Sequence, residues 1–131
     1  KLGMSLEDDF QGKKLKDVLL EPTRIYVKEF KANKSKINGL AHITGGGITE
    51  NLPRVLPENL KAVVNRSKIK VLPIFQFMSK HVELEEMYRT FNMGVGMILV
   101  VNPSNVDAIL ASTDGYVIGE LKAGERKVEF V

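Results

Sequence analysis

The residue types that could do chemistry in this chain gather around one run of glycines. Residues 41–51 read AHITGGGITEN, and the three consecutive glycines are Gly45, Gly46 and Gly47. One or two glycines usually suffice for a turn and each costs backbone entropy, so a third indicates that something comes close to the bare backbone. A strand that passes through such a run into a helix presents several unshielded N–H groups at one point, which favours an anion, with phosphate as the natural candidate.

Spacing alone leaves two interpretations of residues 44–47, called the glycine turn below. The run is not a Walker A loop, because no Lys-Ser or Lys-Thr pair follows it, and it does not match the dinucleotide pattern GxGxxG. In one interpretation the turn binds an anion, with a hydroxyl from Thr44 or Thr49 as a further donor. In the other it is a tight strand-to-helix crossing whose glycines only permit close packing.

The histidine nearest the glycine turn is His42, at the end of the strand expected to face the same cleft. A single histidine in such a place is more often a hydrogen-bonded structural residue than a catalyst. Alternation along the strand tests this: if His42 shares a face with Leu40, we expect it in the core. His81 lies in a polar stretch and is expected at the surface. Two isolated histidines and no cysteine predict no zinc site, and no metal ligand is assigned to this chain.

Two further places carry weaker candidates. Asn92 and Gly94 belong to FNMGVG, where a helix meets a strand; the simplest interpretation is a helix stop, with asparagine or glycine in the left-handed conformation. Arg24, next to Thr23, could hold a phosphate or a carboxylate, although a lone exposed arginine on a helix usually does neither.

The elements that must position these residues follow from hydrophobic periodicity. Strand patterns occur at 37–43, 60–65, 95–101, 115–121 and 127–131, and helical patterns at 21–32, 48–56, 73–81, 83–91 and 102–110. The stretch 95–101, VGMILVV, is apolar on both faces and is expected to be a central strand. Interleaved strands and helices predict an α/β fold, a two-layer sandwich with helices packed on a mixed sheet.

Composition limits the classes of function. The 131 residues, 44% of them hydrophobic, are expected to form one domain. A net charge of +3 with both signs well mixed is too weak to indicate nucleic acid binding. No apolar run is long enough to span a bilayer or resembles a signal peptide, so no membrane partner and a cytoplasmic location are expected. The polar start, without methionine, indicates a fragment of a longer protein.

Three long motifs together resemble one family. LLEPTRIYVK (19–28), AHITGGGITENLPRVLP (41–57) and EEMYRTFNMGVGMILVV (85–101) are similar, in this order, to the C-terminal domain of the aminoimidazole ribonucleotide synthetases, also called phosphoribosylformylglycinamidine cyclo-ligases. A weaker match, GYVIGEL (115–121), falls where the family carries its last strand. The resemblance runs from about residue 19 to the end of the chain, and residues 1–18 are expected to lead in from an N-terminal, ATP-binding domain.

The resemblance implies an enzyme of purine biosynthesis. Family members use ATP and magnesium to close formylglycinamidine ribonucleotide into aminoimidazole ribonucleotide, with release of ADP and phosphate. The formyl oxygen is activated by phosphorylation before the amidine nitrogen attacks. ATP and magnesium would be bound mainly by the N-terminal domain, through which the full-length enzyme forms a homodimer. This chain alone is expected to be inactive.

The resemblance also suggests roles for the candidate residues. The H-x-T-G-G-G segment of the family lies at the cleft between its two domains, so the glycine turn is expected to receive the ribose 5′-phosphate of the substrate, or a phosphate in transit. His42 would then orient or protonate a reacting group. The family motifs F-N-x-G-x-G and E-P-T-R assign a further set to the shaping of the same cleft: Asn92, Gly94, Thr23 and Arg24.

Two departures and two alternatives accompany this resemblance. Met93 stands where relatives can carry cysteine, so no thiol role is assigned there, and ASTDG (111–115) is short against the helix and loop of the family. The main alternative is a free-standing module that binds a phosphate ligand without catalysis. Relatives in the superfamily with other amide or selenium chemistry are a third class, which EPTRIYVK and FNMGVG disfavour.

Overall fold

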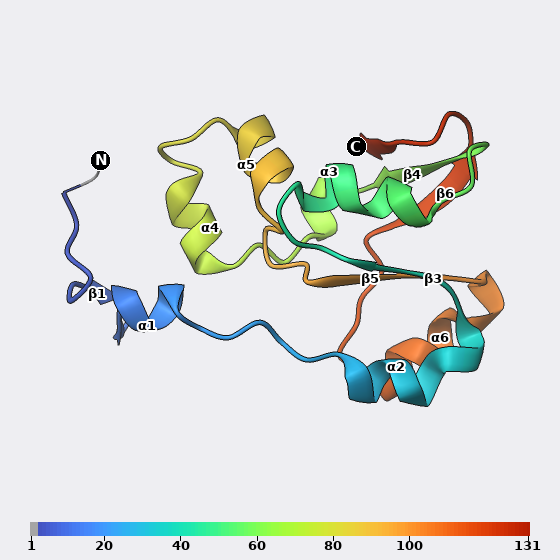
Figure 1. The fold of residues 1–131 in the computed structure, drawn as a ribbon, viewed down its shortest axis with the longest axis horizontal. Coiled ribbons are helices and arrows are strands. Elements are labelled where there is room, and N and C mark those ends of the chain that lie inside the picture. Colours follow the sequence, from blue (N-terminus) through green and yellow to red (C-terminus); the bar gives the residue numbers. More distant parts are fainter. Residues whose placement is uncertain (1–2) are drawn as a thin grey trace.

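The computed structural model describes residues 3–131, which form an α/β arrangement of short elements (Figure 1). The strands are β1 (Asp9–Phe10), β2 (Lys13–Lys14), β3 (Ile37–His42), β4 (Leu60–Val64), β5 (Met97–Val101), β6 (Gly119–Ala123) and β7 (Val128–Phe130). The helices are α1 (Leu15–Leu19), α2 (Val27–Asn33), α3 (Gly47–Asn51), α4 (Pro73–Met78), α5 (Leu84–Thr90) and α6 (Val106–Ser112). Within this part of the chain no helix is long and apolar enough to cross a membrane.

The strands form three small sheets. β1 and β2 pair with each other, β3 pairs antiparallel with β5, and β4 lies between β6 and β7. The last sheet is mixed, because β4 is antiparallel to β6 and parallel to β7. The predicted α/β class is therefore confirmed, and a mixed sheet is present, but the described strands do not join into one continuous sheet.

The core lies where α3 and α5 pack beside β3 and β4. Its most deeply buried apolar side chains are Ile43, Ile48, Met87 and Met93. Burial of this kind contributes roughly 1.5–3 kcal/mol for each large apolar side chain. Met87 and Tyr88 of α5 are both buried, at 0% and 4% exposed. The glycine turn and the end of α5 are held together by this packing.

Three expected elements differ most from the structure. The strand expected at 115–121 begins only at Gly119, as β6. The helix expected at 21–32 begins only at Val27, because the segment before it runs out to an ion pair between Arg24 and Asp114. The strand expected at 95–101 begins at Met97 and is not central: among residues 3–131 it pairs only with β3. Its second apolar side borders a cavity instead of another strand.

The first part of the described chain is set apart from the rest. β1, β2 and α1 lie at one end of the molecule in Figure 1, beside α4. Phe10 meets Phe77 of α4 edge to face, with ring centroids 5.6 Å apart. Leu15 is buried, but Leu19 and Leu20 are 53% and 78% exposed. Little apolar surface therefore holds residues 3–20 in place.

Candidate functional site

Two of the three glycines in the turn are required by the fold itself. Gly46 and Gly47 have φ angles of 93° and 59°, in the left-handed region. A Cβ on Gly47 would lie 2.1 Å from the carbonyl oxygen of Tyr88 and 2.9 Å from that of Phe91. The close-packing interpretation thus accounts for Gly47, where the turn rests on the end of α5.

Gly45 is different from its two neighbours. It is exposed, its φ is not positive, and a Cβ built on it would meet no atom within 4 Å. Neither backbone strain nor packing within the described chain explains a glycine here. A ligand that approaches the backbone from outside would explain a glycine at this position.

The carbonyl groups of the turn converge on one buried side chain, Asn51. Its Nδ2 donates to the carbonyl oxygens of Gly47, Gly45 and Thr44 at 2.8, 3.1 and 3.4 Å. Its Oδ1 accepts from Nη1 of Arg54 at 3.2 Å. Sequence reasoning missed Asn51, although a polar residue four positions after Gly47 on the inner face of a short helix was a usable signal.

The amide groups of the turn are less occupied than its carbonyl groups. The N–H of Gly47 donates to the Thr44 carbonyl at 3.0 Å. Between residues 3 and 131, the N–H groups of Gly45 and Gly46 donate no hydrogen bond. The Glu50 carboxylate reaches the turn, since a Cβ on Gly46 would lie 2.6 Å from its Oε2. An anion bound here would require the Glu50 side chain to swing aside.

The second glycine-containing turn lies against the first. Asn92 accepts the N–H of Gly94 on Oδ1 at 2.9 Å, and its Nδ2 donates to the carbonyl of Ile43 at 3.5 Å. The left-handed residues are Met93 and Gly94, with φ angles of 54° and 101°. α5 itself ends at Thr90 with Phe91 extended, so neither Asn92 nor Gly94 stops the helix in a left-handed conformation. Gly94 is left-handed in the turn that follows, and the Asn92 side chain caps that turn.

The third motif reaches the same region through a residue that the sequence did not single out. Tyr26 packs on Gly96, where a Cβ would lie 2.1 Å from the tyrosine hydroxyl oxygen. The carbonyl of Gly96 accepts the N–H of Ile43 at 2.9 Å. The three sequence motifs thus meet around Gly96.

Arg24 is already paired. Its guanidinium donates to both carboxylate oxygens of Asp114, at 2.6 and 3.0 Å, and to Glu29 at 2.7 Å. These hydrogen bonds hold the pKa of the Asp114 and Glu29 carboxyl groups below their ordinary values and raise the pKa of Arg24 above its own. Arg24 does not contact the glycine turn, and Thr23 is exposed beside it.

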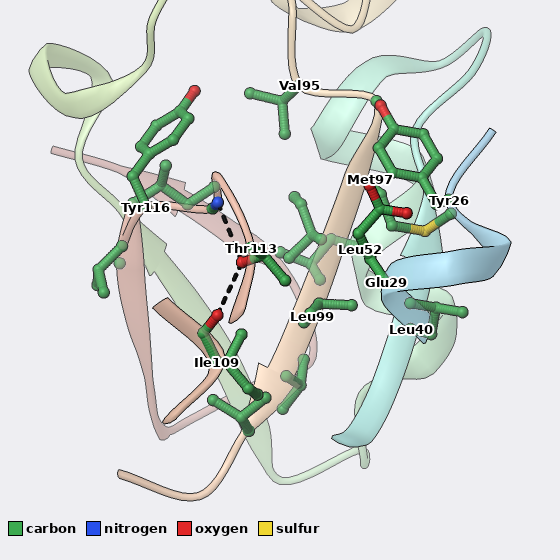
Figure 2. A pocket seen from close by; sticks show the side chains of 18 of the residues that line it. Tyr26, Glu29, Leu40, Leu52, Val95, Met97, Leu99, Ile109, Thr113 and Tyr116 are labelled. Atoms are coloured by element: carbon green, nitrogen blue, oxygen red, sulfur yellow. Dashed lines mark hydrogen bonds between the residues drawn. The ribbon is translucent and has the colours of Figure 1, made fainter. Parts of the chain in front are cut away.

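His42, Arg24 and Gly94 line one cavity of about 1090 Å³ between the β3–β5 sheet and the segment from α6 to β6 (Figure 2). Much of its wall is apolar. Met97 and Leu99 of β5 contribute to it, and so do Ile109 of α6 and Tyr116. The remaining site candidates do not line it: Thr23, Thr44, Gly45, Gly46, Gly47 and Asn92.

His42 is not buried as the alternation along its strand predicted. His42 and Leu40 both line the cavity, as strand alternation predicts, but His42 is exposed. This face of β3 borders the cavity, while Ala41 is buried in the core. His42 is therefore not a core residue, and its imidazole is accessible at the edge next to the glycine turn. His81 is exposed, as expected.

The described residues offer no ready site for a divalent cation. Residues 3–131 contain no cluster of three or more histidine, aspartate or glutamate side chains arranged to hold a metal ion. Magnesium is usually held by one or two carboxylates together with waters and substrate phosphates. A magnesium ion bound here would therefore take most of its ligands from water and substrate.

Comparison with known proteins supports the resemblance. The chain is 47% identical to the phosphoribosylformylglycinamidine cyclo-ligase of Brevibacillus brevis over 139 residues, covering 98% of this chain and 40% of that protein. It is 45% identical to the proteins of the same name from Lachnospira eligens, over 92% of this chain, and Streptococcus pneumoniae, over 95%. The last two alignments cover 38% of each relative, so the chain spans about two fifths of the length of the curated relatives it matches.

The alignment with the Brevibacillus brevis protein has 139 positions, more than the 131 residues of this chain, so it contains gaps on the side of this chain. The match to a family is equally extensive. The family described as AIR synthase related protein, C-terminal domain, matches residues 2–131. This chain therefore belongs to the AIR synthase related family and carries its C-terminal domain.

Proposed function

We propose that this chain is the C-terminal, substrate-side domain of a phosphoribosylformylglycinamidine cyclo-ligase. The complete enzyme would use ATP to cyclise formylglycinamidine ribonucleotide to aminoimidazole ribonucleotide in purine biosynthesis. The observation that carries this proposal is 45–47% identity, over more than nine tenths of the chain, to three proteins of that name.

Within that enzyme, the glycine turn would bind the 5′-phosphate of the substrate. Two features support this role: the unoccupied N–H groups of Gly45 and Gly46, and the exposure of Gly45 without any internal need for glycine. The Thr44 side chain is exposed beside them, where its hydroxyl could donate to the same phosphate. Phosphate oxygens accept several such bonds together.

His42 would act on the reacting part of the substrate. It lies two residues before Thr44 and lines the neighbouring cavity, so a ligand held by its phosphate at the turn could extend toward the imidazole. Imidazole can exchange a proton near neutral pH, which suits a group that orients or protonates a reacting atom. Asn92 and Gly94 would shape the cleft by fixing the adjoining turn. Arg24 would do so from the wall of the cavity, and Thr23 from the exposed segment beside Arg24.

The rest of the enzyme would come from another domain. ATP and magnesium are assigned mainly to an N-terminal domain, as the family resemblance implies. Residues 1–18 would lead in from that domain, a homodimer would form through it, and the enzyme would be cytoplasmic. In the complete domain the helices would pack on one mixed sheet as a two-layer sandwich.

An assay of the full-length protein that contains this chain tests the proposal. With formylglycinamidine ribonucleotide, ATP and magnesium, we expect formation of aminoimidazole ribonucleotide and ADP in equal amounts. His42→Asn should lower turnover by about 10²-fold or more, the usual range for a lost proton-transfer group, while the melting temperature stays close to that of the parent.

His81→Asn is the matched control, because His81 is exposed and lies outside the cavity. It should leave turnover unchanged. A full-length protein that binds ribose phosphates but forms no product would favour the non-catalytic module. Unchanged turnover in the His42→Asn variant would remove the catalytic role of this residue.

A further inference from the structure

We infer that Asn51 is a positioning residue: its side-chain amide turns the N–H groups of Gly45 and Gly46 outward, toward an incoming oxyanion. This inference rests on the proposed function of the glycine turn. Asn51 does not line the cavity, and only 6% of its surface is exposed to solvent. It would therefore act through the backbone and not by contact with the ligand.

Peptide geometry connects Asn51 to the two amides. In a planar trans peptide, the C=O of one residue and the N–H of the next point in opposite directions, and the described chain has no cis peptide. The carbonyls of Thr44 and Gly45 both accept from Asn51 Nδ2, at 3.4 and 3.1 Å, and the carbonyl of Thr44 is also held by the N–H of Gly47 at 3.0 Å. The N–H groups of Gly45 and Gly46, which belong to the same two peptide planes, must then point away from Asn51.

The identity of the side chain matters because only a donor can gather carbonyl groups. Nδ2 carries two hydrogens and faces three carbonyl oxygens, the shortest contact being 2.8 Å to Gly47. Arg54 donates to Oδ1, which fixes the amide in this orientation. An acceptor at the Nδ2 position would repel the carbonyl oxygens and free the two peptide planes to rotate.

Asn51→Asp is the most informative variant, because it keeps the shape and replaces the donor with an acceptor. The new carboxylate would face three carbonyl oxygens, which raise its pKa, and the Arg54 guanidinium, which lowers it. Once protonated, it supplies one hydrogen to the carbonyls. The orientation of the turn should therefore be lost at pH 7 and partly restored as the pH is lowered toward 5, a rescue that a purely packing role would not produce. Glu50 and His42 also lie beside the turn, so the variant is compared with the parent at each pH.

The first measurement needs no ligand. In the labelled 131-residue chain, NMR should detect scalar coupling from the Asn51 side-chain nitrogen to the carbonyl carbon of Gly45, and fast solvent exchange at Gly45 and Gly46. Absence of the coupling, or slow exchange at both amides in the folded chain, would overturn the inference. This result does not depend on whether the turn binds phosphate.

The second measurement is a titration with inorganic sulfate, which keeps its charge between pH 5 and pH 7. The parent chain should bind sulfate at the two amides at both pH values. Asn51→Asp should bind about tenfold more weakly at pH 7, as expected for loss of an interaction worth 1–3 kcal/mol, and should recover part of this at pH 5. Asn59→Asp, an equal charge change at an exposed position, should resemble the parent.

The outcomes separate the two proposals. If the parent shows the coupling and the outward amides but binds no sulfate, the phosphate role fails and the structural effect of Asn51 stands. If folded Asn51→Asp binds sulfate at pH 7 as tightly as the parent, the positioning role is wrong.

Discussion

The three adjacent glycines of the turn have three different physical requirements. Gly47 is confined by the carbonyl oxygens of Tyr88 and Phe91, and Gly46 by its left-handed backbone. Gly45 has neither constraint. Because packing and strain do not explain Gly45, this residue is where a functional requirement can be separated from a structural one.

Substitution by alanine should separate these roles. Gly47→Ala places a methyl group 2.1 Å from a backbone oxygen at a left-handed position, and should lower the free energy of unfolding by about 3 kcal/mol. Gly45→Ala should change it by less than about 0.5 kcal/mol. Urea denaturation measures both. Equal losses would show that the turn is a uniform structural element.

At the scale of elements, the segment before α2 illustrates why local signals misplaced a helix start. Pro22 and Thr23 suit the first turn of a helix, and Phe30 follows at helical spacing. In the structure the helix starts at Val27, and Arg24 before it forms an ion pair with Asp114, which lies ninety residues away in the sequence. A partner so distant in sequence leaves no trace in local periodicity. The same holds for Tyr26 on Gly96.

The Arg24–Asp114 pair gives a pH-dependent prediction. The pKa of Asp114 is lowered in the folded state, chiefly by its hydrogen bond with Arg24. The pair therefore stabilises the fold above the unfolded pKa of about 4, and this contribution is lost as the pH falls through the lower folded value. The parent should lose more stability than Asp114→Asn between pH 5 and pH 2.

The effect should be small, because the Asp114 side chain is 70% exposed, and it should shrink further in high salt. Glu58→Gln, at an exposed position, serves as the control. Denaturation curves at several pH values provide the measurement. A parent and an Asp114→Asn variant with parallel pH profiles would show that the pair adds nothing to stability.

For the whole molecule, the sequence predicted the positions of several strands and helices along the chain better than it predicted which elements pack against each other. The apolar strand at 60–65 and the helix at 83–91 were placed correctly because each carries a strong period of its own. The strand at 95–101 was expected to be central, since both its faces are apolar. In the structure one side borders a cavity of about 1090 Å³, and periodicity cannot tell such a cavity from a covering strand.

The weak attachment of residues 3–20 leads to a prediction about local opening. Phe10 contacts Phe77, but the leucines at the end of this segment are exposed. Amides of β1, β2 and α1 should exchange with solvent faster than those of β4, which is paired on both sides. Phe10→Ala should accelerate exchange in the first group only. Acceleration in β4 as well would show one cooperative unit.

Whether the glycine turn binds a phosphate can be measured directly. In an NMR titration of the chain with ribose 5-phosphate, the amide signals of Gly45 and Gly46 should shift and saturate. That of Gly47 should move less, because its N–H already donates to Thr44. A folded chain in which neither Gly45 nor Gly46 responds at millimolar ligand would contradict the central claim.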